Sequence, residues 1–377
     1  MAARRWGSRA AVAQIVGWEM AEAGAPLRRT SREVPSLSED DVLVRVAGCG
    51  VCHTDLGFLH DGVRTRHALP LILGHEISGH VEDAGTRHAA LVGRAVVVPA
   101  VLPCGVCALC RSGRSTICRS QVMPGNDRDG GFATRVVLPG RFLCPVPGAD
   151  ENPDAPLGAA RGLTLRHLAV VADAVSTAFQ AVQRSGLVSG GVAVVVGLGG
   201  VGTFAAQLAV DAGAIVVGLD VDARRLAAAP AMGVGLALDP RELPGKELRA
   251  RIADFARAAG APPTGWTIFE CSGAVAGQQT AWSLLGYGVT VMVVGFTLEA
   301  ASLRLSNLMA FDARALGNWG CAPELYPALL EKVLAGRIDV VSHTVLRPLS
   351  EVESVLDDVR AHRLDRRVVL VPGKEEA

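Results

Sequence analysis

The feature that most constrains this chain is a glycine turn between an apolar run and a helix-like segment. Val192–Val196 leads directly into Gly197-Leu198-Gly199-Gly200-Val201-Gly202, and Thr203–Ala209 follows. Such a turn lets the backbone approach a pyrophosphate, which free N–H groups at the helix N-terminus then bind. The alternative is a glycine turn that binds nothing. The pattern favours a dinucleotide site on a doubly wound parallel sheet, and its expected residues are Gly197, Gly199, Gly200, Val201 and Gly202.

A carboxylate after the next apolar run bears on which dinucleotide would bind. Asp220 follows Ile215–Leu219 and lies eighteen residues beyond Gly202. A carboxylate there accepts hydrogen bonds from both ribose hydroxyls and repels a 2′-phosphate, so we expect NAD rather than NADP. Arg224 and Arg225 keep the other case open, because they could bind a phosphate if Asp220 turned away.

Two patterns of strands divide the chain, which at 377 residues is too long for one ordinary core. From about residue 175, apolar strands such as Thr267–Glu270 and Val289–Val294 alternate with helix-like segments such as Ser176–Arg184. This arrangement predicts a parallel sheet covered on both faces. The earlier region contains the alternating strand Asp41–Val46 and no long amphipathic helix, so we expect a partly open β-barrel there.

The last part of the chain is too short for a core of its own. A helix over Pro323–Leu334 is followed by strands over Thr344–Leu346 and Arg367–Val371, which we expect to rejoin the barrel. The predicted domains are therefore a barrel made of residues 1–174 and 318–377, with a lobe at about 100–120, and a nucleotide domain made of residues 175–317.

Four cysteines lie close together, at Cys104, Cys107, Cys110 and Cys118. Four thiolates complete a tetrahedron with no open position, so this spacing predicts a structural zinc. The bunching favours metal binding in a reducing cytoplasm over a disulfide framework. The zero formal net charge argues against nucleic-acid and membrane partners, and no apolar run is long enough to span a bilayer. The arginine-containing start, Met1–Arg9, makes a poor signal peptide.

Two further clusters offer metal ligands. Gly48-Cys49-Gly50-Val51-Cys52-His53-Thr54-Asp55 follows a predicted strand, and Gly74-His75-Glu76 comes twenty residues later. Cysteine sulfur and histidine nitrogen together suit zinc, and fewer than four protein ligands leave a position for substrate. The alternative is two buried cysteines and a histidine at the end of a strand. Cys49, Cys144, Cys271 and Cys321 are expected to be buried apolar side chains.

Together these motifs resemble the zinc-dependent, medium-chain alcohol dehydrogenases, from Gln14 onward. The resemblance implies a GroES-like catalytic domain, an NAD domain and two zinc ions per chain. It implies that Cys52 and His75 bind the catalytic zinc, that Glu76 lies beside it or binds it alternately, and that Thr54 begins a proton relay. The residues implied to contact the cofactor are His53 and Arg367 near the phosphates, Thr177 near the nicotinamide, the Val294-Gly295 backbone near the carboxamide, and Asp220 and Arg225.

Two positions depart from the family pattern. Asp173 aligns where the third zinc ligand is often a cysteine or glutamate, so we expect the catalytic set Thr54, Cys52, His75 and Asp173. The alternative makes Asp173 the N-cap of a helix that begins near Ser176. Gly57 replaces a relay histidine found in some members, which leaves the cofactor ribose, His60 or water as the proton's way out.

Three stretches resemble one subfamily, the 6-hydroxycyclohex-1-ene-1-carbonyl-CoA dehydrogenases of anaerobic aromatic (benzoyl-CoA) degradation. They are Val122–Asp127, Val171–Val175 and Leu305–Gly320. This resemblance implies a cyclic acyl-CoA substrate. The alternatives are a dehydrogenase for a simpler alcohol or polyol, a zinc-free C=C reductase of the same fold, and a non-catalytic NAD-binding protein. The family also implies a homodimer or homotetramer, with the sheet edge near Val289–Val294 paired to its symmetry mate.

Overall fold

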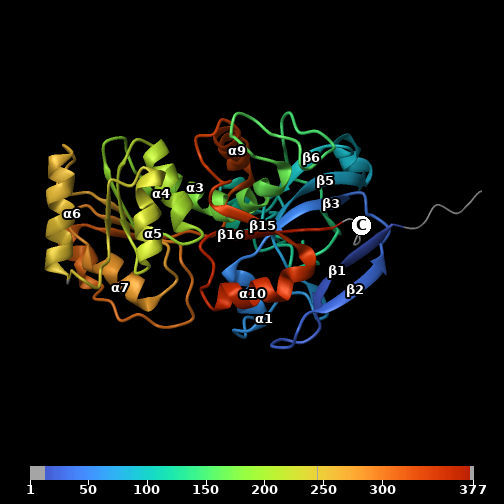
Figure 1. The fold of residues 1–377 in the computed structure, drawn as a ribbon, viewed down its shortest axis with the longest axis horizontal. Helices are drawn as coiled ribbons and strands as arrows, with labels where there is room; N and C mark the ends of the chain where they lie inside the picture. The colour runs from blue at the N-terminus through green and yellow to red at the C-terminus, as the bar shows by residue number, and fades with distance from the viewer. Residues whose placement is uncertain (1–12, 244, 374–377) are drawn as a thin grey trace, which may run out of the picture.

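A six-stranded parallel sheet forms one end of the molecule in the computed structural model of the protein, which describes residues 13–243 and 245–373 (Figure 1). The strand order is β11-β10-β9-β12-β13-β14, so strands are added in opposite directions on either side of the β9–β12 pair. In open sheets of this kind, ligands bind beyond the carboxyl ends of the strands at that reversal. The strands are β9 (Val192–Val196), β10 (Ile215–Leu219), β11 (Leu236–Leu238), β12 (Thr267–Glu270), β13 (Thr290–Val293) and β14 (Arg314–Gly317).

The central strands of this sheet are mostly apolar and are covered by a layer of helices on each face. Every residue of β9 and β12 is buried, because helices cover both faces of the sheet. The predicted doubly wound α/β fold is confirmed, and β9, β10 and β12 have the bounds expected from the sequence. The helices of this unit are α3 (Ala174–Ser185), α4 (Gly202–Asp211), α5 (Ala223–Ala228), α6 (Lys246–Ala258), α7 (Val275–Ser283) and α8 (Ser306–Phe311).

The free edge of the sheet differs from the prediction. β13 lies between β12 and β14, so the expectation that the strand near Val289–Val294 forms the edge is wrong. β14 is short, and three of its four residues are exposed. A four-residue strand whose side chains are mostly exposed has little apolar surface and therefore no strand signal in the sequence.

The other end of the molecule contains a mostly antiparallel seven-stranded sheet and a three-stranded sheet, as the partly open barrel predicts. In the larger sheet β15-β16-β3-β5-β6-β8 are neighbours and β7 pairs with β3, whereas β2-β1-β4 form the smaller one. The strands are β1 (Gln14–Met20), β2 (Arg28–Glu33), β3 (Asp41–Gly50), β4 (Leu71–Ile72), β5 (Glu76–Ala84), β6 (Ala95–Val98), β7 (Arg135–Pro139), β8 (Cys144–Pro145), β15 (Thr344–Pro348) and β16 (Arg367–Val371).

The end of the chain completes this larger sheet. β16 pairs with the carboxyl end of β3, where Leu370 lies opposite Cys49. This pairing brings Arg367, at the start of β16, next to both metal-ligand motifs, the one after β3 and the one at the start of β5.

The remaining helices are α1 (His53–Leu59), α2 (Ala108–Arg111), α9 (Tyr326–Leu334) and α10 (Val352–Arg360), with 3-10 turns η1 (Thr86–Leu91), η2 (Ser115–Ile117), η3 (Leu165–Ala172), η4 (Ala229–Met232), η5 (Pro323–Leu325) and η6 (Leu349–Glu351).

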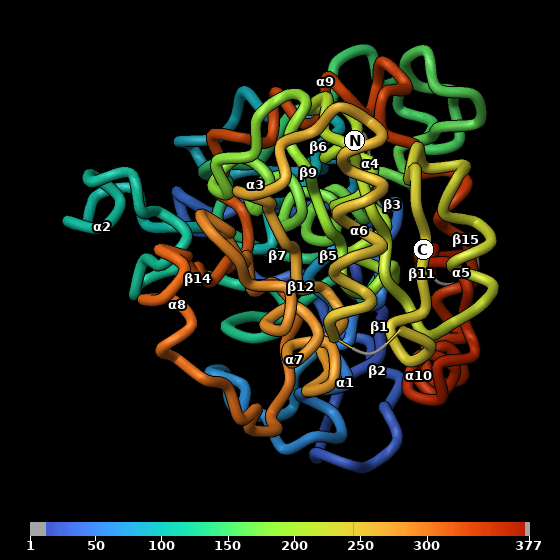
Figure 2. The backbone as a smooth tube through the Cα atoms, turned by 90° about the vertical axis from the view of Figure 1, so that its left-hand side faces the viewer, coloured from blue at the N-terminus to red at the C-terminus, as the bar shows by residue number. Residues whose placement is uncertain are grey.

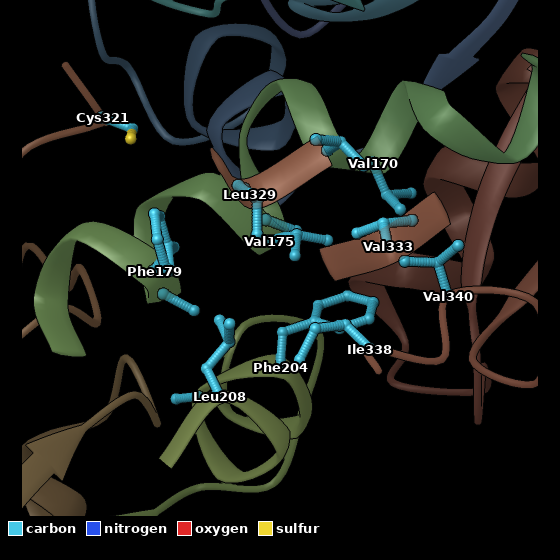
Figure 3. Packing of buried hydrophobic residues seen from close by; sticks show 14 of the residues in the cluster. Val170, Val175, Phe179, Phe204, Leu208, Cys321, Leu329, Val333, Ile338 and Val340 are labelled. Carbon is cyan, nitrogen blue, oxygen red and sulfur yellow. The ribbon is translucent and has the colours of Figure 1, made fainter. Parts of the chain in front are cut away.

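One apolar cluster joins the two ends of the molecule. It contains Val170 of η3, Val175 and Phe179 of α3, Phe204 of α4 and Leu329 of α9 (Figure 3). α3 therefore packs against residues of both units. In the described ranges, no helix is long and apolar enough to cross a membrane, and the Met1–Arg9 start lies outside those ranges.

Candidate active site and nucleotide site

Four potential metal ligands from three parts of the chain lie together between the two units. Cys52 follows β3, His75 and Glu76 stand at the start of β5, and Asp173 lies between η3 and α3. One ligand atom from each of the four residues lies within 4.8 Å of the others. The structure thus brings together all four residues that the sequence nominated for a catalytic zinc.

The carboxylate of Asp173 faces this cluster rather than the helix that follows it. Its Oδ2 is 3.5 Å from His75 Nε2 and 3.9 Å from Cys52 Sγ. Asp173 does occupy the N-cap position of α3, but its side chain makes no capping hydrogen bond. The helix starts at Ala174, two residues earlier than predicted, so the N-cap alternative is correct for the position of Asp173 but not for a side-chain capping hydrogen bond. Burial favours the neutral acid, but the charge of the neighbouring His75 and the Thr177 hydroxyl lower the pKa of Asp173 to about 2.

Glu76 is held by a buried ion pair with Arg367. The guanidinium Nε donates to Glu76 Oε2 at 2.9 Å, and Nη2 donates to Oε1. The Glu76 side chain is 0% exposed and that of Arg367 is 7% exposed. Burial raises the pKa of Glu76 although Arg367 opposes the shift, and the surrounding carboxylates and Cys52 raise the pKa of Arg367 against the effect of burial. Both oxygens of Glu76 are therefore engaged, whereas Asp173 keeps one oxygen directed at the cluster.

Close approach of the backbone makes room for this ion pair. A β-carbon at Gly50 would lie 2.0 Å from Glu76 Oε2, so only glycine fits opposite that carboxylate. Gly50 and Glu76 are direct neighbours across the β3–β5 pair. The glycine of the Gly50-Val51-Cys52 motif thus has a specific structural role beside the site.

His75 is a buried imidazole without an ordinary hydrogen bond. Its side chain is 1% exposed, and neither ring nitrogen has a hydrogen-bond partner among the residues that the structure describes. Nδ1 lies 3.4 Å from Asp55 Oδ1, and Nε2 faces Asp173 and Cys52. Burial alone would lower the pKa of His75, but the two carboxylates raise it well above its usual range. An unpaired buried nitrogen that faces a thiol and a carboxylate fits a metal ion, for which a neutral imidazole would give up its proton.

Asp55 is a residue of the candidate site that the sequence prediction did not include among the site residues. Its Oδ2 accepts a hydrogen bond from the Cys52 N–H at 2.9 Å, and its Oδ1 accepts one from the Gly74 N–H at 3.2 Å. One carboxylate thus connects the Cys52 turn, the Gly74 turn and the His75 ring. Asp55 is three residues after the N-cap of α1, and an acid at that spacing was the available signal.

Thr54 and Gly57 lie on α1 next to the cluster. Thr54 Oγ1 is 3.6 Å from Cys52 Sγ, so the hydroxyl borders the ligand set. A β-carbon at Gly57 would meet Val63 at 3.5 Å, and the apolar side chain of Val63 fills the direction in which a side chain at this position would point. Position 57 therefore offers no proton acceptor, and Thr54 is the hydroxyl at the site.

The four cysteines of the predicted lobe also gather. Cys107 Sγ lies 3.5 Å from Cys110 Sγ and 3.8 Å from Cys118 Sγ, and Cys104 Sγ lies 3.9 Å from Cys110 Sγ. The N–H groups of Val106 and Cys107 lower the pKa of Cys104 to about 6, which favours the thiolate that a metal requires. The segment that bears α2 stands away from the body of the molecule (Figure 2). Such an arrangement fits a closed four-sulfur site.

All nine cysteines are free. Cys49, Cys144 and Cys321 are buried as predicted, whereas Cys271 is partly exposed.

The glycine turn has the geometry that a pyrophosphate site requires. Gly197 has φ of 88°, and a β-carbon at Gly202 would lie 1.7 Å from Gly197 O. At Gly200 a β-carbon would be 2.7 Å from Arg367 Nη1, and at Gly199 it would be 3.5 Å from Arg225 Nη1. Two guanidinium groups therefore flank the N-terminus of α4, which begins at Gly202. Val201 is the N-cap of α4.

Asp220 is directed at this turn. Its Oδ2 accepts a hydrogen bond from the Leu198 N–H at 2.7 Å and its Oδ1 accepts one from the Asp222 N–H at 2.9 Å. Arg225 Nη1 lies 3.6 Å from Asp220 Oδ2. Arg224 pairs with Asp222 and with Asp365. Arg224 and Arg225 are expected to bind a 2′-phosphate only if Asp220 turns away, and in this structure Asp220 faces the glycine turn.

The other expected cofactor residues lie in α1, in α3 and after β13. His53 stacks on His362 with ring centroids 5.9 Å apart, and burial followed by the charge of Arg367 lowers the pKa of His53. The N–H groups of Val294 and Gly295 both donate to Glu270 O at 2.9 Å. Thr177 differs from expectation in one respect, because its hydroxyl donates to Asp173 Oδ1.

A second residue that the sequence did not single out ends β12. Glu270 is 1% exposed, and its Oε1 accepts hydrogen bonds from the Ser272 N–H at 2.9 Å and from the Ser272 hydroxyl. Its Oε2 has no hydrogen-bond partner in the part of the chain that the structure describes. Burial raises the pKa of Glu270. This carboxyl lies under the turns that follow β12 and β13.

Comparisons with known proteins agree with this arrangement. Residues 38–148 match the family described as alcohol dehydrogenase GroES-like domain, and residues 200–335 match the family described as zinc-binding dehydrogenase. An alcohol dehydrogenase of Geobacillus stearothermophilus is 27% identical over 348 residues, which cover 92% of this chain and 96% of that protein. A Mycobacterium tuberculosis protein named "Probable alcohol dehydrogenase AdhA" is 30% identical over 257 residues, 65% of this chain and 70% of that protein.

A solved structure has the same overall fold. The crystal structure of the alcohol dehydrogenase of Aeropyrum pernix superposes with a TM-score of 0.80 at 26% identity, and the match covers 95% of this chain and all of that one.

Proposed function

We propose that this chain, which belongs to the zinc-dependent medium-chain alcohol dehydrogenases, oxidises a secondary alcohol to a ketone with NAD as acceptor. The family makes it an oxidoreductase that acts on CH–OH groups. The observation that carries the proposal is the cluster of Cys52, His75 and Asp173. Arg367 connects this cluster to the glycine turn, because its guanidinium pairs with Glu76 and also lies beside Gly200.

Cys52 Sγ, His75 Nε2 and Asp173 Oδ2 are the proposed ligands of the catalytic zinc. This set is supported by the buried Nε2 of His75, which has no hydrogen-bond partner among the described residues, and by the Asp173 oxygen that faces it. In contrast, both oxygens of Glu76 are bound to Arg367. Three protein ligands leave one position for substrate. A zinc ion held there would supply Lewis acidity toward an alcohol oxygen, and Cys104, Cys107, Cys110 and Cys118 would hold a second, structural zinc.

The protein's own groups would then orient the substrate and take its proton. Asp55 holds the His75 ring with Nε2 toward the cluster. Thr54, whose hydroxyl borders Cys52, is the proposed first acceptor of the alcohol proton. Arg367, Arg225 and the N–H groups at the start of α4 would bind the phosphates of the dinucleotide, which takes up the two electrons and the hydrogen removed from carbon.

NAD rather than NADP is proposed because of the charges after β10. Asp220 lies at the turn with its side chain 4% exposed, and Arg224 is already paired with two carboxylates. A 2′-phosphate near Asp220 would be repelled by its carboxylate, and the guanidinium of Arg224 is already neutralised by its own two carboxylate partners. The comparison of kcat/KM for NAD and NADP tests this choice, and equal values would contradict it.

The substrate proposal is a ring alcohol on a coenzyme A thioester, 6-hydroxycyclohex-1-ene-1-carbonyl-CoA. It rests on the resemblance of three stretches, and their positions support it. Gly125 of the first stretch packs on Gly74, the second contains Asp173, and Asn318 of the third donates to Thr177 O at 3.0 Å. All three border the ligand cluster.

An alcohol or polyol without coenzyme A is the second candidate, favoured by the named activity of the Geobacillus relative. The two candidates separate by kcat/KM on the cyclic hydroxyacyl-CoA and on free cyclic alcohols. An advantage of the thioester supports the first candidate, and equal or better use of the free alcohol supports the second.

The zinc set is tested with Asp173→Ala and Asp173→Cys. Alanine should lower the zinc content from two ions per chain to about one and abolish NAD reduction. Cysteine should restore the metal content, since a thiolate is a good zinc ligand. An Asp173→Ala protein that keeps two zinc ions and full activity would contradict the proposed ligation.

We also propose that the protein is a homo-oligomer paired through β14 and that it acts in the cytoplasm. β14 is the edge strand beside β13, and exposed apolar side chains lie on the segment before it: Phe296, Leu298, Leu305 and Met309. Exposed apolar surface of this kind favours a protein interface. The free cysteines fit a reducing compartment. Met309→Asp should yield monomers in analytical ultracentrifugation, and an unchanged assembly would contradict pairing at this edge.

A further inference from the structure

Thr177 of α3 hydrogen-bonds to both the side chain and the backbone of Asp173. Its hydroxyl donates to Asp173 Oδ1 at 2.7 Å, and its backbone N–H donates to Asp173 O at 2.7 Å. Thr177 therefore occupies one carboxylate oxygen and leaves Oδ2 as the oxygen that faces His75 and Cys52. A carboxylate with one oxygen engaged in this way offers a metal a single donor atom.

The backbone on either side of Asp173 is fixed by a buried tyrosine. Asp173 has φ of −136° and ψ of −66°, which separates η3 from α3. Tyr326, at the start of α9 and 1% exposed, donates its hydroxyl to Ala172 O at 2.5 Å and accepts a hydrogen bond from Ser176 Oγ at 3.0 Å. The residues before and after Asp173 are thus held by one side chain from a distant part of the sequence.

We propose that Thr177, Ser176 and Tyr326 are positioning residues that fix Asp173 as a one-oxygen zinc ligand. The inference rests on the proposed function, in which Asp173 binds the catalytic zinc. A carboxylate free to rotate must lose that freedom when it binds metal, and one free to use both oxygens would also occupy the position needed by the substrate. The hydrogen bond from the Thr177 hydroxyl restricts rotation of the carboxylate and occupies its second oxygen before a metal binds.

The magnitude follows from what such partners do in other metal sites. Loss of a side chain that orients a metal ligand typically weakens metal affinity about 10–100-fold. Thr177→Val keeps the shape of the side chain and removes the hydroxyl, so we expect a loss in that range at the catalytic site. Thr177→Ser keeps the hydroxyl and should bind metal like the wild type. Tyr326→Phe, which removes the donor to Ala172 O, should weaken binding in the same direction.

The test is a cobalt(II) titration of the metal-free full-length protein, followed by visible absorption. A site with one thiolate and a site with four thiolates absorb differently, so the two sites are followed separately. Thr280→Val is the matched control, because the Thr280 hydroxyl also donates four residues back along a helix, to Ala276 O at 2.8 Å, far from the cluster. Thermal unfolding of each metal-free variant shows whether the fold is kept. The four-cysteine lobe should be unchanged in every variant.

The outcomes separate this inference from the proposed function. If Asp173→Ala binds cobalt at the catalytic site as tightly as the wild type, the ligation proposed above fails. If Asp173→Ala weakens binding but Thr177→Val does not, the ligation stands and the positioning role is overturned. Equal weakening in Thr177→Val and Thr177→Ser also overturns it, because the hydroxyl would then not be the cause. Weakening in Thr177→Val alone, with Thr177→Ser and Thr280→Val unchanged, supports the inference.

Discussion

The buried pair of Glu76 and Arg367 allows a quantitative prediction for Arg367→Met. Both side chains are almost fully buried, and the guanidinium donates to both carboxylate oxygens. Removal of one partner from such a pair leaves an uncompensated buried charge and costs about 3–5 kcal/mol, whereas replacement of both partners by well-packed apolar groups of similar volume is often near neutral. We therefore expect Arg367→Met to lower the free energy of unfolding by about 3–5 kcal/mol, and Glu76→Gln in the same chain to restore most of it.

The size of the loss should depend on zinc. Glu76 lies among the four ligand atoms that gather within 4.8 Å, so in Arg367→Met its freed carboxylate can turn toward a bound metal. The destabilisation should therefore be larger in the metal-free protein than in the zinc-loaded one. In the metal-free protein the midpoint of thermal unfolding should fall on the order of 10 °C, given about 2–4 °C per kcal/mol for domains of this size.

The assay is thermal unfolding of the single and double variants with and without zinc. Arg347→Met is the control, because Arg347 pairs with Glu351 on the surface and such pairs contribute only about 0–1 kcal/mol. A loss below about 1 kcal/mol in Arg367→Met, or a double variant no more stable than the single one, would refute the reasoning.

Three further predictions concern the lobe, the sheet and the glycine turn. Cys110→Ser should remove one zinc ion per chain and make the 104–118 segment sensitive to limited proteolysis, which metal analysis and mass spectrometry would detect. Glu270→Gln should stabilise the protein at pH 8 by about 1 kcal/mol, because burial raises the pKa of Glu270 and ionisation of the folded protein is then unfavourable. That gain should vanish as the pH falls toward about 4.3, where the unfolded chain also protonates, and a gain independent of pH in thermal unfolding would contradict it. Gly202→Ala should weaken NADH binding at least about 10-fold in fluorescence titration, since its β-carbon would lie 1.7 Å from Gly197 O and displace the phosphate turn; unchanged affinity would count against the site.

The parts of the fold that could be predicted are those whose burial is uniform. β9, β10, β12 and β16 appear in the sequence as short apolar runs because both of their faces are covered. β11 and β14 were not predicted, because three or four residues with exposed or half-exposed side chains leave no periodic signal. α1 was missed for a different reason, since its N-cap is a cysteine rather than the usual serine, threonine or aspartate.

The two metal clusters differ in how far they could be predicted. The lobe has four ligands within fifteen residues, so spacing alone defines it. The proposed catalytic cluster joins residues 52, 75, 76 and 173, which only the pairing of β3 with β5 and the turn before α3 bring together. Family resemblance supplied these positions, but it could not show that Thr177 binds Asp173 or that Arg367 pairs with a glutamate 291 residues away.

Arg367 is expected to affect both stability and cofactor binding, and the two effects of its loss can be separated. The same guanidinium that pairs with Glu76 lies beside Gly200, where a β-carbon would be 2.7 Å from Nη1. Glu76→Gln can remove the uncompensated charge left by Arg367→Met, but it cannot replace the cation at the phosphate turn. The double variant should therefore unfold near the wild-type temperature and still bind NADH at least about 10-fold more weakly, the cost of one lost charge-assisted hydrogen bond. If the double variant recovered both properties, Arg367 would act on the cofactor only through the fold, and the direct contact with the phosphates would be wrong.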